Sequence, residues 1–184
     1  MAVTNKLMIL SDIHGSAKWC RAALDAFERE GAERMLLLGD ILYHGPRNPL
    51  PEEYMPARVA DMLNAVGGEI ICVHGNCDSD VDQVVLDFPI TAESCVLYAG
   101  GRMIFATHGH VFNEATPPKL KKGDFLLHGH THVQVCREHE AYTYVNPGSV
   151  SLPKEDSWRG YMLLTDGGFV WKTLDGEEKM RKDF

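Results

Sequence analysis

The sequence lacks the features that mark exported, membrane-spanning and disulfide-linked proteins. Its first apolar run, LMIL at 7–10, breaks at once into Ser11 and Asp12. This run is too short for the core of a signal peptide or for a membrane span. The five cysteines are odd in number and include no CxxC pair, so a disulfide framework is not expected. We therefore expect a cytoplasmic protein with free thiols and no membrane contact.

Basic residues are scarce relative to acidic ones. The chain has 18 Lys and Arg against 26 Asp and Glu, a formal net charge of -8. Nucleic-acid binders usually carry a basic stripe, because phosphate binding is driven by release of counterions. A nucleic-acid partner is therefore not expected, and a small anionic substrate would need a local positive centre such as a bound metal ion.

In other respects the composition is that of an ordinary globular domain, with 45% apolar and 24% charged residues. We find no repeat, low-complexity tract or linker in the 184 residues. A chain of this length suits one domain with one substantial core. We therefore expect a single domain spanning residues 1–184.

Short apolar runs recur at 7–10, 34–38, 69–73, 102–106 and 124–127, and their lengths and polar boundaries predict buried strands. Apolar residues at helical spacing predict two helices between the first three runs. One runs from an N-cap at Ser16 to a stop at Gly31, and the other spans 55–66. This alternation predicts βαβ units and a mainly parallel first half. The later segments 142–145 and 161–174 predict further strands, the second a hairpin that turns at 166–168.

Each of the five runs ends in a polar signature: SDIHG, GDILYHG, HGNCD, THGH and HGHTH. The carboxyl ends of strands form the ligand crevice in open α/β sheets, so the five signatures are expected to meet at one site. Any one of them also fits a turn or a buried polar residue. Five successive strand ends with metal-ligand residue types would require five independent coincidences if each were only a turn or a buried polar residue.

The donors in these signatures are nitrogen and oxygen atoms, and no cysteine stands at a metal-like spacing. Such a set suits Mn, Fe, Co, Ni or Zn rather than structural zinc held by thiolates. The donors are too many for one tetrahedral ion. We therefore expect two divalent ions, preferably manganese, that share a bridging carboxylate.

The ordered signatures resemble those of the calcineurin-like metallophosphoesterases: Asp12-x-His14, Gly39-Asp40, Gly75-Asn76, His108 and Gly129-His130-Thr131-His132. HGPRNPLP at 44–51, GNCDSDVDQ at 75–83 and NPGSVSLPK at 146–154 are similar to the small bacterial YfcE-type phosphodiesterases. The resemblance spans nearly the whole chain. It implies an α/β fold of two packed β-sheets flanked by helices, in the four-layer αββα order of metallo-dependent phosphatases.

The resemblance also implies a ligand set, in which one metal ion is bound by Asp12, His14, Asp40 and His132, and a second by Asp40, Asn76, His108 and His130. Asp40, Asn76 and His108 are then also the expected catalytic residues. The implied activity is hydrolysis of small phosphodiesters by attack of a metal-bound hydroxide. His128, the remaining histidine of LLHGHTH at 126–132, is not expected to bind metal.

The chain departs from many relatives at Cys77, where they carry histidine with a role at the leaving group. A thiol with a pKa near 8.5 is a poor acid for this task. We therefore expect either a preference for esters with good leaving groups or an acid from elsewhere, such as His44, His110 or a metal-bound water. Cys77 itself is either catalytic or a packed small residue. Arg47 is a candidate for binding the substrate phosphate through its planar fork, or a solvated loop residue.

Two other functions are possible for a protein that resembles this family. The retromer scaffold subunit resembles this family but acts by binding proteins, and it lacks the full ligand set. A nuclease is disfavoured by the acidic charge. Because all seven ligand positions are filled here, we expect an enzyme. The sequence leaves open whether the protein is a monomer or a homo-oligomer.

Overall fold

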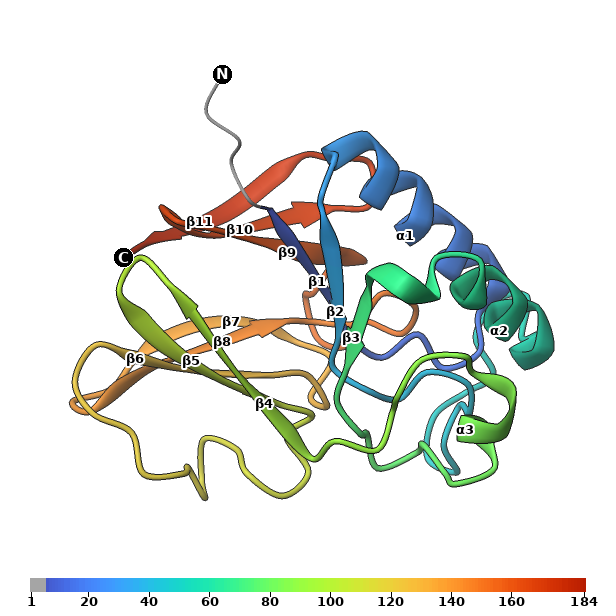
Figure 1. The fold of residues 1–184 in the computed structure, drawn as a ribbon, viewed down its shortest axis with the longest axis horizontal. Helices are drawn as coiled ribbons and strands as arrows, with labels where there is room; N and C mark the ends of the chain where they lie inside the picture. The colour runs from blue at the N-terminus through green and yellow to red at the C-terminus, as the bar shows by residue number, and fades with distance from the viewer. Residues whose placement is uncertain (1–5) are drawn as a thin grey trace.

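The computed structural model of the chain describes residues 6–184 (Figure 1), so residues 1–5 of the predicted domain lie outside the described residues. The elements are β1 Leu7–Leu10, α1 Ala17–Glu30, β2 Arg34–Leu37, α2 Pro56–Asn64, a 3-10 turn at Gly67–Glu69, β3 Ile70–Cys72, α3 Asp82–Val85, β4 Ser94–Ala99, β5 Arg102–Thr107, β6 Asp124–His128, β7 Gln134–Glu138, β8 Tyr142–Pro147, β9 Gly160–Thr165, β10 Gly168–Thr173 and β11 Glu178–Asp183. Among these described elements, no helix is long and apolar enough to cross a membrane.

The strands form two mixed sheets. The first has the order β11-β10-β9-β1-β2-β3, and the second has the order β4-β5-β6-β8-β7. β1, β2 and β3 pair in parallel, which confirms the predicted parallel first half. In the second sheet β5, β6 and β8 are parallel, whereas the edge strands β4 and β7 pair antiparallel. The parallel strands of both sheets carry the predicted ligand loops at their carboxyl ends.

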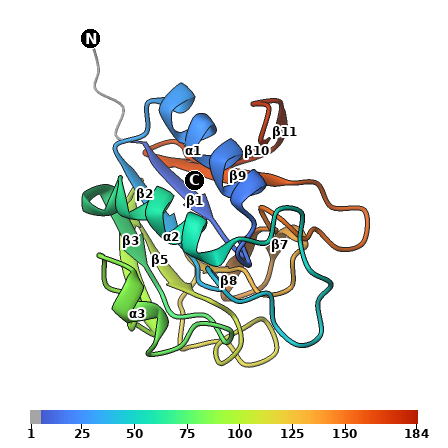
Figure 2. The same cartoon turned by 90° about the vertical axis from the view of Figure 1, so that its right-hand side faces the viewer.

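The alternation of side chains along β1 builds a core on each face of the first sheet. Met8 and Leu10 pack toward α1, whereas Ile9 packs with Leu127 of the second sheet, because successive strand residues point to opposite faces. Figure 2 shows α1 and α2 in front of the first sheet. The outer face of the second sheet is packed by Leu120 from the 108–123 loop rather than by a helix. The predicted fold of two packed sheets flanked by helices is thus confirmed, but the described helices gather on one side, so among residues 6–184 the second sheet lacks the outer helical layer that the expected four-layer αββα order includes.

Both predicted ends of α1 are confirmed. Ser16 accepts a hydrogen bond from the backbone N–H of Trp19, and Gly31 adopts the left-handed conformation with φ 58°. The Gly31 N–H donates to the Glu28 carbonyl, which satisfies one of the last free carbonyls of the helix. The second predicted helix, at 55–66, is slightly shorter in the structure at Pro56–Asn64.

Glu30 joins the end of α1 to the first sheet and gives the fold a pH dependence. Tyr161 donates a hydrogen bond of 2.7 Å to Glu30 Oε1, which also pairs with the Lys172 ammonium. Burial opposes ionisation of Glu30, but Lys172 and Tyr161 lower its pKa below the ordinary value. A lowered pKa contributes stability above the unfolded-state pKa, and this stability is lost as the pH falls through the folded-state pKa.

We therefore expect Glu30→Gln to lower the melting temperature at pH 7 and to lose this effect in acid. Thermal unfolding of both proteins between pH 7 and pH 3 measures the difference. Glu177→Gln is the matched control, because Glu177 pairs with Lys179 only at the exposed surface. A Glu30→Gln difference that stayed constant over this range would contradict the expected role of the Glu30 carboxylate.

Candidate metal centre

The loops that follow β1, β2, β3, β5 and β6 meet at one site, as the sequence predicts. Backbone hydrogen bonds join the first two loops: Asp12 N–H donates to Gly39 O at 3.2 Å, and His14 N–H donates to Asp40 O at 2.9 Å. All seven predicted ligands lie in these loops. Asp12, His14, Asp40, His108 and His132 are buried, His130 is half-buried and Asn76 is exposed.

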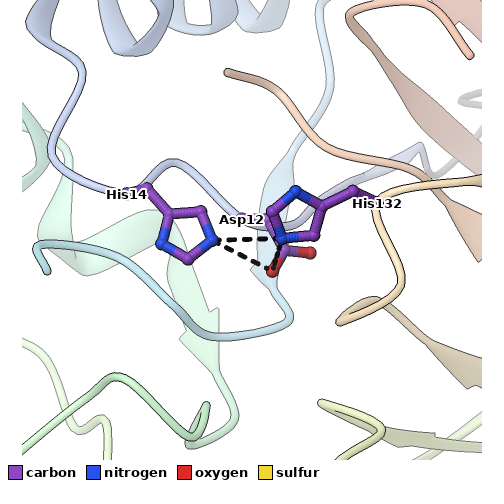
Figure 3. A group of neighbouring side chains, drawn as sticks. All are labelled: Asp12, His14 and His132. Carbon is purple, nitrogen blue, oxygen red and sulfur yellow. Dashed lines mark hydrogen bonds and ion pairs between the residues drawn. The ribbon is translucent and has the colours of Figure 1, made fainter. Parts of the chain in front are cut away.

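The first group of donors consists of Asp12, His14 and His132 (Figure 3). The Nε2 atoms of His14 and His132 are 3.2 Å apart. Asp12 Oδ1 lies 3.2 Å from His132 Nε2 and 3.5 Å from His14 Nε2. Asp40 Oδ2 lies 3.7 Å from His14 Nε2, so it faces the same group. These four residues are the set that the resemblance implied for one metal ion.

The second group lies on the other side of Asp40. His108 Nε2 is 3.0 Å from Asn76 Oδ1, 3.1 Å from His130 Nδ1 and 3.5 Å from Asp40 Oδ1. Asp40 therefore directs Oδ2 to the first group and Oδ1 to the second. The two groups match the two predicted ligand sets, with Asp40 between them.

The tautomers of three histidines follow from their backbone partners. His14 Nδ1, His108 Nδ1 and His132 Nδ1 lie 2.8, 2.7 and 2.6 Å from the carbonyl oxygens of Tyr43, Leu38 and Leu152. A carbonyl only accepts hydrogen bonds, so each Nδ1 carries a proton, and in the neutral ring each Nε2 presents a lone pair. His14 Nε2 and His132 Nε2 then face each other as two acceptors.

Two lone pairs that face each other in a buried site repel unless a proton or a metal ion lies between them. Asp12 Oδ1 is also buried without a hydrogen-bond partner, next to these two nitrogens. A buried, unpaired carboxylate oxygen is costly unless it is compensated. The donor types, their tautomers and this unpaired oxygen all fit a divalent metal ion.

The pKa shifts of Asp12 and His130 favour the deprotonated forms that metal binding requires, whereas at His14 the effect of burial is outweighed by the Asp12 carboxylate, which raises the pKa of this ring. Burial opposes ionisation of Asp12, but His132 and His14, when they carry a proton on Nε2, hold the pKa of this carboxyl well below the ordinary value, and a cation in the place of those protons would favour the carboxylate in the same way. Burial lowers the pKa of His130 to about 4, so its ring is neutral at pH 7. A carboxylate and a neutral imidazole are therefore available at neutral pH.

The backbone at the ligands is strained. Seven described residues other than glycine have positive φ angles, and five of these are predicted ligands: Asp12 at 58°, His14 at 51°, Asp40 at 56°, His130 at 64° and His132 at 62°. Such conformations cost about 1–3 kcal/mol each and gather at functional sites, where the surrounding structure enforces them. The fold thus accepts local strain in order to aim these side chains at the two donor groups.

Residues behind the ligands hold these loops in place. Asp78 Oδ2 accepts the backbone N–H groups of Asp40 and Gly75 at 2.9 and 2.8 Å, and Asp78 Oδ1 accepts that of Ile41 at 2.8 Å. From the sequence, Asp78 is expected at most to orient a ligand, as carboxylates behind metal ligands often do. Its three backbone contacts join the loop after β2 to the loop after β3.

Two serines that the sequence did not single out support Asp12. Ser149 Oγ and Ser151 Oγ donate hydrogen bonds of 2.8 and 3.0 Å to the carbonyl oxygen of Asp12. Asn146 Nδ2 donates to Gly129 O at 2.8 Å, which supports the loop that carries His130. In the sequence, Asn146, Ser149 and Ser151 are indicated only by the stretch NPGSVSLPK at 146–154, which contains all three.

Gly75 lets the loops after β2 and β3 approach each other at the bridging carboxylate. A Cβ at this position would lie 2.3 Å from both Asp40 N and Asp40 Oδ1. We therefore expect Gly75→Ala to displace Asp40 and to weaken metal binding by about tenfold or more, as measured by calorimetric titration with Mn²⁺. Gly68→Ala is the control, since a Cβ there meets no atom within 4 Å. Unchanged Mn²⁺ affinity in Gly75→Ala would contradict the close approach.

A cavity of about 380 Å³ lies over the two donor groups, and we call it the metal-centre cavity. Its lining includes Asp40, Asn76, His130 and His132 together with Arg47, Cys77, Thr131 and Lys154. Arg47 and Cys77 are therefore placed beside the predicted ligands. Lys154 was not singled out in the sequence, and it brings a second basic side chain to this cavity.

The other candidate histidines lie at the margin. His44 packs between Tyr43 and Tyr54, with ring centroids 4.8 and 5.3 Å away, and it is not among the residues that line the metal-centre cavity. The His110 ring is 5.4 Å from that of His108, and burial lowers its pKa. His128 stacks on Tyr144 at 4.3 Å and belongs to neither donor group.

Cys77 lies between the two donor groups, and its Sγ forms a further candidate cluster with donor atoms of His14 and Asp40. Its backbone N–H donates to Asp40 Oδ1 at 2.8 Å, and its Sγ accepts a hydrogen bond from Asn76 Nδ2 at 3.2 Å. This contact directs Asn76 Oδ1 toward His108. Burial, followed by the charge of Asp40, raises the pKa of the Cys77 thiol to about 12.

Comparisons with known proteins identify the family of this chain. Residues 6–166 match the model of the calcineurin-like phosphoesterase superfamily domain. Phosphodiesterase YfcE of Escherichia coli strain K12 is 46% identical over 159 residues, which cover 86% of each chain. A solved structure of E. coli YfcE, described as a phosphoesterase, superposes with a TM-score of 0.92, 42% identity and coverage of 97% of this chain and 98% of that one.

A more distant structure shows how widely the fold is shared. Vacuolar Protein Sorting 29 from Cryptosporidium parvum superposes with a TM-score of 0.61 and 17% identity, over 98% of each chain. At this identity the likeness concerns the fold alone. The family match over most of the chain and the identity to YfcE go further: this chain belongs to the calcineurin-like phosphoesterase superfamily.

Proposed function

We propose that this chain is a metal-dependent phosphodiesterase that hydrolyses small phosphodiesters at two adjacent divalent metal ions. The observation that carries the proposal is the position of Asp40, whose two oxygens face separate groups of nitrogen and oxygen donors. The 46% identity to a protein named phosphodiesterase supports the same reaction class. Together they favour a phosphoric diester hydrolase.

The residues of the site would hold the substrate phosphate by charge. Two divalent ions bring four positive charges, and Asp12 and Asp40 cancel two, so the centre keeps a charge of about +2 with neutral His and Asn ligands. Arg47 and Lys154 line the same cavity and add positive charge where a phosphate would enter. A local positive centre of this kind would attract an anionic phosphate even though the chain has a net charge of -8.

Two metal ions held by these residues would supply Lewis-acid chemistry, which polarises phosphoryl oxygens and lowers the pKa of water toward about 7. The chain's own contribution is to orient the rings of His108 and His132 through the contacts of their Nδ1 atoms with backbone carbonyls, to place His130 Nδ1 beside His108 Nε2, and to position the shared carboxylate of Asp40. Cys77 does not supply a strong acid, because its thiol has a raised pKa. We therefore expect faster turnover of esters whose leaving groups depart without protonation.

The same residues disfavour two alternative functions, a protein-binding scaffold and a nuclease. A protein-binding scaffold on this fold would not need a complete ligand set with matched histidine tautomers, so the donor groups favour catalysis. A nuclease would need a basic track for the nucleic-acid backbone, which a chain with this acidic balance does not favour. Cytoplasmic location, manganese as the ion used and a homo-oligomer stay predictions.

Removal of metal tests the proposal. The purified protein would be stripped with a chelator and assayed with bis(4-nitrophenyl) phosphate before and after addition of Mn²⁺. We expect turnover to disappear on stripping and to return with Mn²⁺, whereas circular dichroism shows a folded protein throughout. Full turnover by the stripped protein, or none after Mn²⁺ is restored, would contradict a metal-dependent phosphodiesterase.

A further inference from the structure

A second and larger cavity, of about 630 Å³, lies beside the metal-centre cavity. It is formed by three parts of the chain, the loop before α2, the α2 helix and the segment from Cys77 to α3, and its lining residues include Leu42, Tyr43, Tyr54, Ala57, Cys77 and Val85. α2 and α3 lie on the same side of the molecule (Figure 1). A volume of this size is typical of small-molecule sites.

Two residues connect this second cavity to the metal ligands. Cys77 lines both cavities, and its backbone N–H donates to the bridging oxygen Asp40 Oδ1 at 2.8 Å. Tyr43 lines the second cavity, and its carbonyl oxygen lies 2.8 Å from His14 Nδ1. A substrate whose phosphate sits at the metal centre can therefore extend an attached group past Cys77 into the second cavity.

The chemistry of the two cavities differs. Arg47 and Lys154 line the metal-centre cavity, whereas the residues that line the second cavity include Asp61 and Asp82 but no Lys or Arg. Aliphatic and aromatic side chains supply most of its remaining lining, with Tyr43 and Tyr54 as flat rings. Such a cavity disfavours a second phosphate or carboxylate and favours an uncharged apolar or aromatic group.

We propose that the second cavity is an ester subsite, which binds one uncharged apolar or aromatic ester group of the substrate while the phosphate lies at the metal centre. This inference rests on the proposed function and narrows its substrate class. The substrate is a phosphodiester with at least one neutral, ring-sized arm, rather than a diester with two small or two anionic arms. Burial of such an arm supplies the affinity that distinguishes these esters.

Binding of two small phosphodiesters tests the ester subsite without relying on turnover. Methyl phenyl phosphate and dimethyl phosphate carry the same charge and differ only in the aromatic arm. Calorimetric titration of the Mn²⁺-loaded wild-type protein is expected to show about tenfold tighter binding of methyl phenyl phosphate. Ala57→Trp, which fills the cavity from α2, is expected to reduce this ratio to about threefold or less and to leave dimethyl phosphate binding unchanged.

Two neighbouring valines of α3 provide a matched pair of charge variants. Val85 lines the ester subsite and is 48% exposed, whereas Val84 is 82% exposed and lies outside the lining. We expect Val85→Asp to remove the preference for methyl phenyl phosphate and Val84→Asp to retain it. The two variants have the same net charge, so a difference in their preference for methyl phenyl phosphate is due to the position of the new carboxylate inside or outside the ester subsite.

Equal binding of the two diesters by the wild-type protein would overturn the ester subsite, as would a preference that both Ala57→Trp and Val85→Asp leave intact. Hydrolysis of bis(4-nitrophenyl) phosphate is measured on the same samples. Turnover without the binding preference would overturn the subsite alone. The binding preference without turnover would overturn the proposed phosphodiesterase function and leave an aryl-ester binding cavity.

Discussion

Asp40→Asn is expected to lower kcat for phosphodiester hydrolysis by about a thousandfold or more, the largest effect expected of a single substitution in this chain. The substitution turns one oxygen that faces a donor group into an amide nitrogen and removes the negative charge shared by both groups. Asparagine tolerates the left-handed backbone at this position and keeps one oxygen to accept the Cys77 N–H. The fold should therefore persist while the metal centre fails.

Asp80→Asn is the matched control for this experiment. Asp80 is exposed and belongs to neither donor group. We expect wild-type kcat and wild-type metal content in the control, and a folded but inactive protein with reduced metal content in Asp40→Asn. If Asp40→Asn kept more than about a tenth of the wild-type kcat, Asp40 would not be the shared ligand.

His132→Ala and His130→Ala are each expected to remove one of two bound ions and to lower kcat by about a hundredfold or more. The reason is their separation: His132 contacts the first donor group through Nε2, whereas His130 contacts the second through Nδ1. The measurement is metal content per chain together with turnover of bis(4-nitrophenyl) phosphate. Each variant should retain one ion, because each leaves the other donor group complete.

His128→Ala is the internal control in the same short stretch. His128 stacks on Tyr144 outside both donor groups, so the substitution should lower the melting temperature through lost packing and keep two ions per chain. Loss of an ion in His128→Ala, or two ions retained in both His130→Ala and His132→Ala, would contradict the assignment of these three histidines.

The fold was predictable where strands are buried and less so at the sheet edges. β1, β2, β5 and β6 were each predicted from short apolar runs, and their side chains fill the cores. The strands that the sequence did not predict, β4, β7 and β11, are all edge strands. β11 reads EKMRKD and β7 reads QVCRE, because an edge strand faces solvent and carries charge that hides the strand pattern.

The site was predictable in its residue types but not in its geometry. The polar ends of five apolar runs predicted one converging site, and the resemblance supplied the partition of ligands. The division of Asp40 between two groups, and the left-handed backbone at Asp12 and His132, depend on contacts between distant loops. Lys154 carried no motif of its own, and the ester subsite arises only where α2 and α3 come together.

Metal content tests the central claim most directly, namely that Asp40 joins two metal sites. The chelator-stripped protein would be saturated with Mn²⁺, freed of unbound ion by gel filtration and measured for manganese and protein by elemental analysis. The two donor groups predict two ions per wild-type chain. A value of one ion or none, in a protein that is folded and saturated, would contradict the two-metal centre.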